Sequence, residues 1–331
     1  MRNLLLILSL FSSQILASVC ENINLYEEAQ FDRTIYNQGD MHTCYAHSLS
    51  ALYSHEYKQS INPYWIAYIH KDKLLHWNPR NLNFSLLSWS FTDLKKRGNC
   101  SPTQLESRLE YLKQGTNYSD DQFFYFVQIY FKKEQEVQKL FNYLKETSKD
   151  FEVSWLISDV QKLVKTIENS GHKKLFDFFE KEVFSDCSQL SPVTGKLINT
   201  ARGFESNEEL QKEIMTQLTQ QKAISIGLCP NAAYKLSNED IKIKPRILKA
   251  TKSGCGAHYV NIVGSRESNN RCEFLIRNSY PGFWAHESLT CLCERDGTTF
   301  NCQKDTKDKV LGCWVPSDKV LTNTYDISYF E

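Results

Sequence analysis

A chain of 331 residues with 41% hydrophobic side chains is long and apolar enough for a globular core, either one large domain or two smaller ones. That apolar content excludes an intrinsically disordered chain. Lysine plus arginine and aspartate plus glutamate both number 39, so the formal net charge is zero. A balanced charge offers no overall field that attracts nucleic acid or an anionic membrane, and we expect neither as a partner.

The first residues have the layout of a secretory signal peptide. Arg2 precedes an apolar run that ends near Leu16, and the small residues Ala17 and Ser18 follow it. A transmembrane anchor needs roughly 20 mostly apolar residues, whereas this run is shorter and contains polar side chains. We predict removal of residues 1–17, no membrane anchor, and export to a secreted or periplasmic location.

The eleven cysteines fit an oxidising compartment, because one reactive thiol leaves ten that can pair. Five of them fall in the last fifth of the chain and predict a disulfide-stapled β region: Cys272, Cys291, Cys293, Cys302 and Cys313. The pairing itself stays open, since ten cysteines allow too many connectivities. Zinc is the rival interpretation. One residue separates Cys291 from Cys293 and only His286 lies nearby, so we expect no metal site.

The first predicted helix covers residues 44–58, which lack proline and glycine and place Leu49, Leu52 and Tyr53 on one face. It therefore begins at Cys44. The spacing predicts a second helix over 62–75, with Asn62 as its cap and Pro63 at its first position. A third helix over 89–98 ends at a glycine.

Between about Asp120 and Cys187 the composition shifts to long, charged, aromatic-rich segments that fit two or three helices. Their aromatic residues recur at helical spacing, which indicates the packed core of an inserted helical subdomain rather than a ligand site. A helix over 207–221 then precedes strand-like runs at 223–229, 258–264 and 272–278. We predict an α+β fold with a helical lobe over 18–118, a helical insertion over 119–190 and a β-rich lobe over 191–331.

Cys44 is the candidate nucleophile. A thiol becomes a good nucleophile when it loses its proton, and a helix N-terminus favours the resulting anion. Such a site also needs an imidazole and a third group that orients it, and His258 and Asn278 lie on or beside successive predicted strands. Gln38, six residues before the thiol, is the candidate donor to an oxyanion, together with the backbone amide of the cysteine.

Three blocks of sequence, in this order, resemble those of the papain family of cysteine peptidases. NQGDMHTCYAHS is similar to the segment around that family's nucleophile, AHYVNIVG to its His block, and RNSYPGFW to its Asn-Ser-Trp block. The resemblance covers most of the chain except the insertion. It implies a two-lobed papain-like fold and peptide-bond hydrolysis through a Cys-His-Asn triad and a covalent acyl-enzyme, with no cofactor.

Taken residue by residue, the resemblance makes Cys44 the nucleophile, His258 the general base and acid, Asn278 the orienting amide and Gln38 the oxyanion donor. It implies a protein or peptide substrate, and we expect a monomer.

The resemblance also places His42, Tyr45, Tyr280 and Trp284 at the substrate cleft. Tyr280 stands where the family usually has a tryptophan that shields the His and Asn pair, and Trp284 matches a second tryptophan.

Two departures lie beside the nucleophile. Met41 replaces the first cysteine of the family motif, so the usual disulfide there cannot form, and His42 replaces a glycine that leaves room for substrate. We expect no N-terminal propeptide, because Gln38 lies only about twenty residues beyond the predicted cleavage point. The nucleophile and the histidine are 214 residues apart (258 minus 44), which is longer than usual, and the insertion accounts for the excess.

Several alternatives stay open. His47 is a rival base, since it lies three residues after Cys44 on the same helical face, although we expect a structural role for it. A binding module that kept the fold but lost catalysis would fit Met41 and His42, but all four chemical positions are filled. An amidase or acyltransferase acting on non-protein amides would use the same triad.

Overall fold

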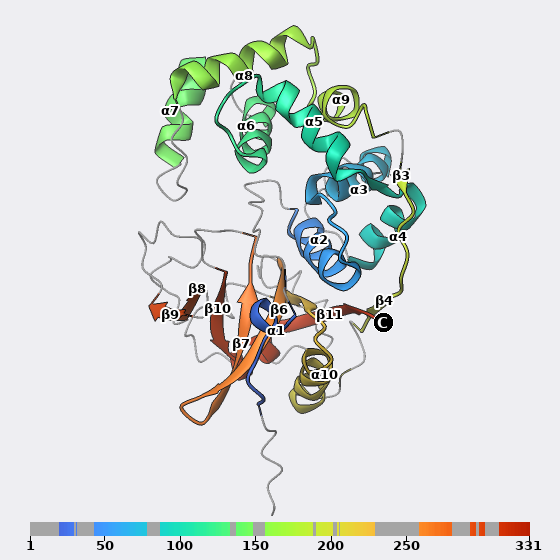
Figure 1. Ribbon diagram of the computed structural model, residues 1–331, viewed down its shortest axis with the longest axis vertical. Coiled ribbons are helices and arrows are strands. Elements are labelled where there is room, and N and C mark those ends of the chain that lie inside the picture. Colours follow the sequence, from blue (N-terminus) through green and yellow to red (C-terminus); the bar gives the residue numbers. More distant parts are fainter. Residues whose placement is uncertain are drawn as a thin grey trace, which may run out of the picture.

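The computed structural model describes residues 20–29, 31, 43–77, 87–132, 137–147, 156–187, 190–200, 204, 206–228, 258–279, 292–295, 298–301 and 311–331. Within these residues, helices dominate the first half of the chain and an antiparallel sheet dominates the second half (Figure 1). This arrangement confirms the predicted α+β class. The predicted signal peptide lies outside the described residues.

The described helices up to residue 183 are α1 (Leu25–Glu28), α2 (Cys44–Tyr57), α3 (Pro63–Trp77), α4 (Leu87–Arg97), α5 (Pro102–Lys113), α6 (Asp120–Lys132), α7 (Val137–Thr147), α8 (Ile157–Asn169) and α9 (Leu175–Phe178), which continues into the π-helical turn η3 (Phe179–Val183). Among the described residues, α10 (Asn207–Thr219) and α13 (Ser317–Asn323) follow further along the chain. No helix in the described part of the chain is long and apolar enough to cross a bilayer.

Local sequence explains where the first helices begin and end. As predicted, α2 begins at Cys44, and α3 begins at Pro63 after a cap in which the side-chain oxygen of Asn62 accepts the N–H of Tyr64 at 2.8 Å. The chain leaves α4 through Gly98, whose φ of +87° is a conformation that side chains rarely adopt. The helices α2, α3 and α4 therefore begin and end close to the bounds that the residue pattern predicts.

The strands of the main sheet are β1 (Ile23–Asn24), β4 (Leu197–Asn199), β5 (Ile224–Leu228), β6 (His258–Ser268), β7 (Arg271–Arg277), β8 (Leu292–Arg295), β9 (Thr298–Asn301), β10 (Gly312–Pro316) and β11 (Thr324–Phe330). Within the described residues their order is β4-β11-β5-β6-β7-β10-β8-β9, with β1 beside β6. A separate pair joins β2 (Asn99–Cys100) to β3 (Leu190–Ser191). The strand β6 is thus central and has β5 and β7 as neighbours.

The N-terminal segment belongs to the sheet. We expected the chain from residue 18 onward to form the helical lobe, but Ile23 in β1 pairs with Ser265 in β6. A disulfide between Cys20 and Cys272 secures the same contact. Cys313 in β10 is disulfide-bonded as well. Disulfides persist in oxidising compartments, so these bonds are consistent with an extracytoplasmic protein.

The helical segment between Cys100 and Cys187, which contains the predicted insertion, begins and ends at one place. Cys100 and Cys187 form a disulfide with a Cα to Cα distance of 5.1 Å, next to the β2 and β3 pair. The helices α5 to α9 lie between these cysteines, and within the described residues α6, α7, α8 and α9 lie from Asp120 onward, where we expected two or three. Aromatic residues of α6 are buried, and the ring of Phe124 stacks on Tyr64 of α3 at 3.9 Å. The prediction that these aromatics form a packed core is confirmed.

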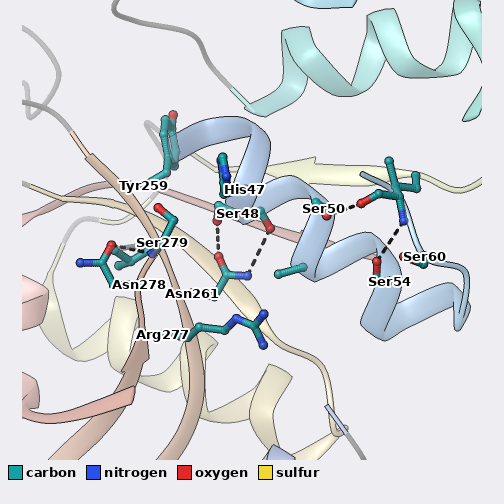
Figure 2. Close-up of a pocket in the computed structure, with 13 residues that line it drawn as sticks. His47, Ser48, Ser50, Ser54, Ser60, Tyr259, Asn261, Arg277, Asn278 and Ser279 are labelled. Atoms are coloured by element: carbon teal, nitrogen blue, oxygen red, sulfur yellow. Dashed lines mark hydrogen bonds between the residues drawn. The ribbon is translucent and has the colours of Figure 1, made fainter. Parts of the chain in front are cut away.

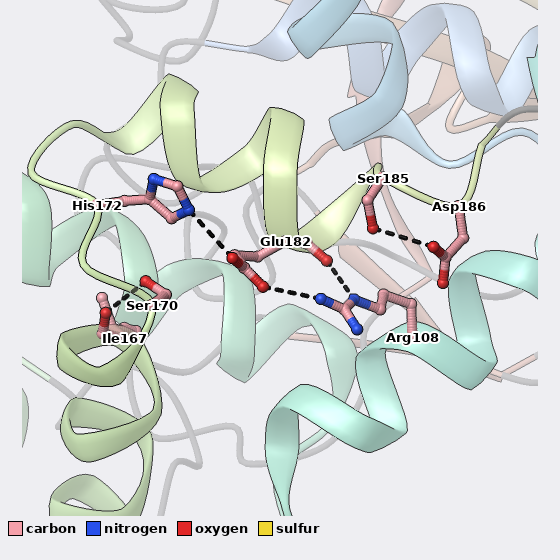
Figure 3. A network of polar contacts seen from close by, with 7 residues as sticks. All are labelled: Arg108, Ile167, Ser170, His172, Glu182, Ser185 and Asp186. Carbon is pink, nitrogen blue, oxygen red and sulfur yellow. Dashed lines mark hydrogen bonds and ion pairs between the residues drawn. The ribbon is translucent and has the colours of Figure 1, made fainter.

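A polar network also holds the insertion together (Figure 3). Arg108 of α5 donates to the carboxylate of Glu182 in η3 at 2.8 Å, and Nε2 of His172 lies 3.0 Å from the other oxygen of that carboxylate. The side chains of this ion pair are only about one-fifth exposed, at 20% for Arg108 and 23% for Glu182. The pair therefore orients α5 against η3 and adds modest stability.

Candidate active site

The helix α2 lies between the helical half and the sheet (Figure 1). It packs against α3 and α4 on one side and against β5, β6 and β11 on the other. Cys44 is its first residue, is not part of a disulfide and is 8% exposed. The first N–H groups of a helix have no acceptor within the helix, so this end of α2 stabilises negative charge on the sulfur.

His258 and Asn278 approach each other across two neighbouring strands. His258 is the first residue of β6, and Asn278 directly follows β7. In the register of these strands Asn261 pairs with Arg277, so the histidine and the asparagine lie diagonally across the ladder on the same face of the sheet. Nε2 of His258 is 2.7 Å from Oδ1 of Asn278, and both side chains are buried.

The partners of Asn278 determine which nitrogen of the imidazole carries a proton. Its Oδ1 also accepts the backbone N–H of Ser279 at 2.8 Å. A backbone N–H can only donate, so the atom at that position must be the amide oxygen. Nε2 of His258 must then be the donor in its own bond to this oxygen. In the neutral ring Nδ1 is therefore the basic nitrogen, and this is the atom that can exchange a proton with a thiol.

Burial controls the charge of this histidine. Burial lowers the pKa of His258 to about 4, while its hydrogen bond to Asn278 acts in the opposite direction. A buried imidazolium is costly unless a negative charge lies beside it. A thiolate is such a charge, so ionisation of a neighbouring cysteine and of this ring would stabilise each other.

The charge of an ionised Cys44 acts on two buried tyrosines. Burial raises the pKa of Tyr325 well above its ordinary value, and the charge of ionised Cys44 adds to this effect. Burial also raises the pKa of Tyr259, which follows His258, with Asp326, Tyr325 and then Cys44 contributing further. Because such charge effects weaken with distance, the sulfur lies near these two tyrosines.

His47 makes the contacts of a structural residue. Its Nδ1 donates to the carbonyl oxygen of Thr43 at 3.0 Å, and its ring meets Tyr64 edge-on at 5.4 Å. Burial lowers the pKa of His47 to about 4, against the bond to Thr43, and the charges of His258 and Arg277 lower it further. These contacts fit the structural role expected for it.

Tyr45 differs from the expectation. We expected it to line the substrate cleft, but it is 2% exposed and its ring lies edge-on against His70 at 5.4 Å. Burial raises the pKa of Tyr45, with Cys44 and Asp93 adding to the effect. Its side chain belongs to the core, since it is buried against His70 of α3. The other predicted residues of the site, namely Gln38, His42, Tyr280 and Trp284, lie outside the described residues.

A polar contact between α2 and the sheet was not predicted from the residue pattern. A pocket between this helix and strands β6 and β7 is lined by hydroxyl, amide and guanidinium groups (Figure 2). Its wall includes Ser48, Asn261 and Arg277, all buried. One signal was present in the sequence, since Asn261 is an amide within the otherwise apolar run that follows His258.

No known protein-family profile matches this chain, and no curated protein sequence matches it. Among solved structures, one from a study of the limited antibody cross-reactivity between the mite allergens Blo t 1 and Der p 1 is similar at a TM-score of 0.42 and 12% identity. The alignment covers 96% of this chain and 73% of that one. The similarity is distant and supports no argument about the site. The geometry described above comes from the contacts within this chain.

Proposed function

We propose that this chain is an exported cysteine hydrolase of the papain type, which cleaves peptide bonds with Cys44 as nucleophile. The observation that carries the proposal is the 2.7 Å contact of His258 Nε2 with Asn278, in a chain that also has a thiol outside any disulfide at the N-terminus of α2. This contact commits Nε2 to the asparagine and leaves Nδ1 to serve the sulfur. The three sequence blocks that resemble the papain family support the same assignment.

The reaction proceeds in two stages. The thiolate of Cys44 attacks the carbonyl carbon of the substrate, and a carbon–sulfur bond forms while the carbonyl oxygen becomes an oxyanion. Imidazolium His258 then gives its Nδ1 proton to the leaving nitrogen as the carbon–nitrogen bond breaks. In the second stage Nδ1 takes a proton from water, the resulting hydroxide attacks the acyl group, and the thiolate departs.

The supporting residues have separate tasks. Asn278 keeps the ring of His258 in the orientation and tautomer that present Nδ1 to the sulfur. We assign donation to the oxyanion to the backbone N–H of Cys44 and to Gln38. His42, Tyr280 and Trp284 are the proposed cleft residues beyond the described part of the chain. The proposal needs no cofactor and includes a two-lobed arrangement, a protein or peptide substrate and a monomer.

The test uses the purified protein from residue 18 onward and a mixture of unfolded proteins, with new peptide ends identified by mass spectrometry. We expect cleavage by the wild type, complete loss in Cys44→Ala, and a decrease of at least about 10²-fold in His258→Ala. His47→Phe is the matched histidine control and should stay within a few-fold of wild type. Equal cleavage by wild type and Cys44→Ala would contradict the proposal, and so would a wild type that cleaves nothing.

A further inference from the structure

We propose that Asn261 is a positioning residue, whose hydrogen bonds to Ser48 set the separation between Cys44 and His258. This role rests on the proposed function, because the separation matters only if the two side chains react together. The contacts between α2 and the sheet do not depend on that function.

Asn261 holds one residue of α2 at two points (Figure 2). Its Oδ1 accepts the hydroxyl of Ser48, and its Nδ2 donates to the backbone carbonyl of the same residue at 3.2 Å. Ser48 is 5% exposed and Asn261 is 2% exposed, so bulk solvent has little access to these bonds. A single side chain thus fixes both the backbone and the side chain of one helical residue against β6.

A second strand, β5, also contacts Ser48. Ser225 of β5 pairs with Asn261 of β6 in the sheet register, and its Oγ lies 2.6 Å from the Oγ of Ser48. The one hydroxyl proton of Ser48 goes to Asn261, so Ser225 must be the donor to Ser48. The three side chains form a directional chain of hydrogen bonds, in which each bond strengthens the next.

These contacts lie close to the reacting groups on both elements. Ser48 follows Cys44 by one helical turn, on the same face of α2. Asn261 follows His258 by three residues of β6, and Ser225 precedes by three residues the Leu228 that pairs with this histidine. The hydrogen bonds among Ser48, Asn261 and Ser225 therefore fix the start of α2 relative to the start of β6.

Hydrogen bonds hold the helix at one position on the sheet, which apolar packing alone does not do. An amide buried in an apolar strand costs free energy unless it is paired, and a leucine would fill the space without that cost. Apolar contacts tolerate small sliding of a helix over a sheet, whereas three directional bonds do not. A nucleophile and its base need this control, because a misplacement of about 1 Å can cost about 10²-fold in rate.

The test measures geometry apart from hydrolysis. The bifunctional reagent 1,3-dibromoacetone alkylates Cys44 first and can then join it to His258. At about pH 9 a large share of the thiol is ionised in every variant, so the yield of the cross-link among alkylated chains reports separation rather than thiol pKa. The variants are Asn261→Leu, Ser48→Ala and the matched control Ser50→Ala. Ser50 is a buried serine of the same helix that donates to the carbonyl of Ile61, outside the sheet.

We expect wild type and Ser50→Ala to cross-link alike, Asn261→Leu to lose at least about five-fold in yield, and Ser48→Ala to fall between them. Asn261→Leu should also lower kcat about tenfold or more with little change in KM. A yield in Asn261→Leu equal to wild type overturns the inference, as does an equal loss in Ser50→Ala. If Asn261→Leu fails to fold, Ser48→Ala and Ser225→Ala decide by the same criterion.

The inference and the proposed function can fail separately. A wild type that cross-links in an Asn261-dependent way but cleaves no peptide keeps the positioning role and removes the peptidase. A wild type that cleaves peptides through Cys44 while Asn261→Leu behaves normally does the reverse.

Discussion

The side-chain oxygen of Asn278 lies 2.7 Å from Nε2 of His258, and the backbone N–H of Ser279 holds the same oxygen at 2.8 Å. Rotation of the amide would break both bonds, so the asparagine has one stable orientation and imposes one tautomer on the histidine. The site is therefore organised around an oxygen that accepts two buried donors.

Asn278→Ala removes this oxygen and should lower kcat about 10- to 100-fold, because His258 then loses its fixed orientation. Asn278→Asp keeps an oxygen at the same position and adds a negative charge, which raises the pKa of the imidazole. We expect it to retain more activity than the alanine variant and to extend activity to higher pH. Profiles of kcat/KM against pH check both points. Equal activity and identical profiles in the two variants would contradict the orienting role.

His47→Phe should make the protein less sensitive to acid. The pKa of His47 is about 4 in the folded state and about 6.5 in the unfolded chain, so the unfolded chain takes up the proton first as the pH falls. The wild type therefore loses up to about 3 kcal/mol of stability between pH 6.5 and 4 through this residue. Phenylalanine keeps the ring contact with Tyr64 and does not titrate. Urea denaturation at several pH values measures the difference, and parallel losses in both proteins would refute it.

Asp326→Asn should stabilise the protein above pH 6. Burial raises the pKa of Asp326 to about 6, although Tyr259 and Asn199 donate to its carboxylate at 2.6 and 2.9 Å. The ordinary value is about 3.9, so the wild type loses up to about 3 kcal/mol of stability as the pH rises from 4 through 6. In the variant the amide can still accept from Asn199 and can donate to the phenol oxygen of Tyr259. Thermal unfolding at pH 4 and pH 8 should show a gain only at the higher pH, and an equal shift at both would contradict the assignment.

Removal of the Cys100–Cys187 disulfide should loosen the insertion selectively. The bond joins residues 87 positions apart, and closing a loop of that length contributes about 4–5 kcal/mol in the chain-entropy description. In the double alanine variant we expect faster hydrogen exchange in α6 to α8, with β6 and β7 little changed. The Cys20–Cys272 pair is the matched control, and its removal should affect the sheet instead. If hydrogen exchange accelerated equally in the helices and in the sheet in both variants, the two disulfides would not stabilise separate regions and the prediction would be wrong.

Local signals in the sequence were sufficient for the elements that carry the site. A run without proline or glycine predicted a helix that begins at Cys44, and apolar runs predicted the strands at His258 and before Asn278. Periodicity and turn residues act over a few positions, so these features could be found from one sequence.

The features that were missed depend on residues far apart in the chain. The pairing of Ile23 with Ser265 spans more than 240 residues, and two-residue strands leave no periodic signal. The contact of Ser48 with Asn261 also joins distant segments, and a lone asparagine in a strand does not show which residue it meets. Tyr45 was placed at a cleft by analogy of position, whereas packing against His70 holds it in the core.

The most direct measurement follows the rate of Cys44 alkylation by iodoacetamide as a function of pH, in the wild type and in His258→Ala. If the histidine holds the thiolate, the wild type reacts rapidly at pH values well below the ordinary thiol pKa of about 8.5, and the variant requires pH near that value. Two superimposable profiles near 8.5 would show that His258 does not activate the thiol, and the proposed chemistry would be wrong.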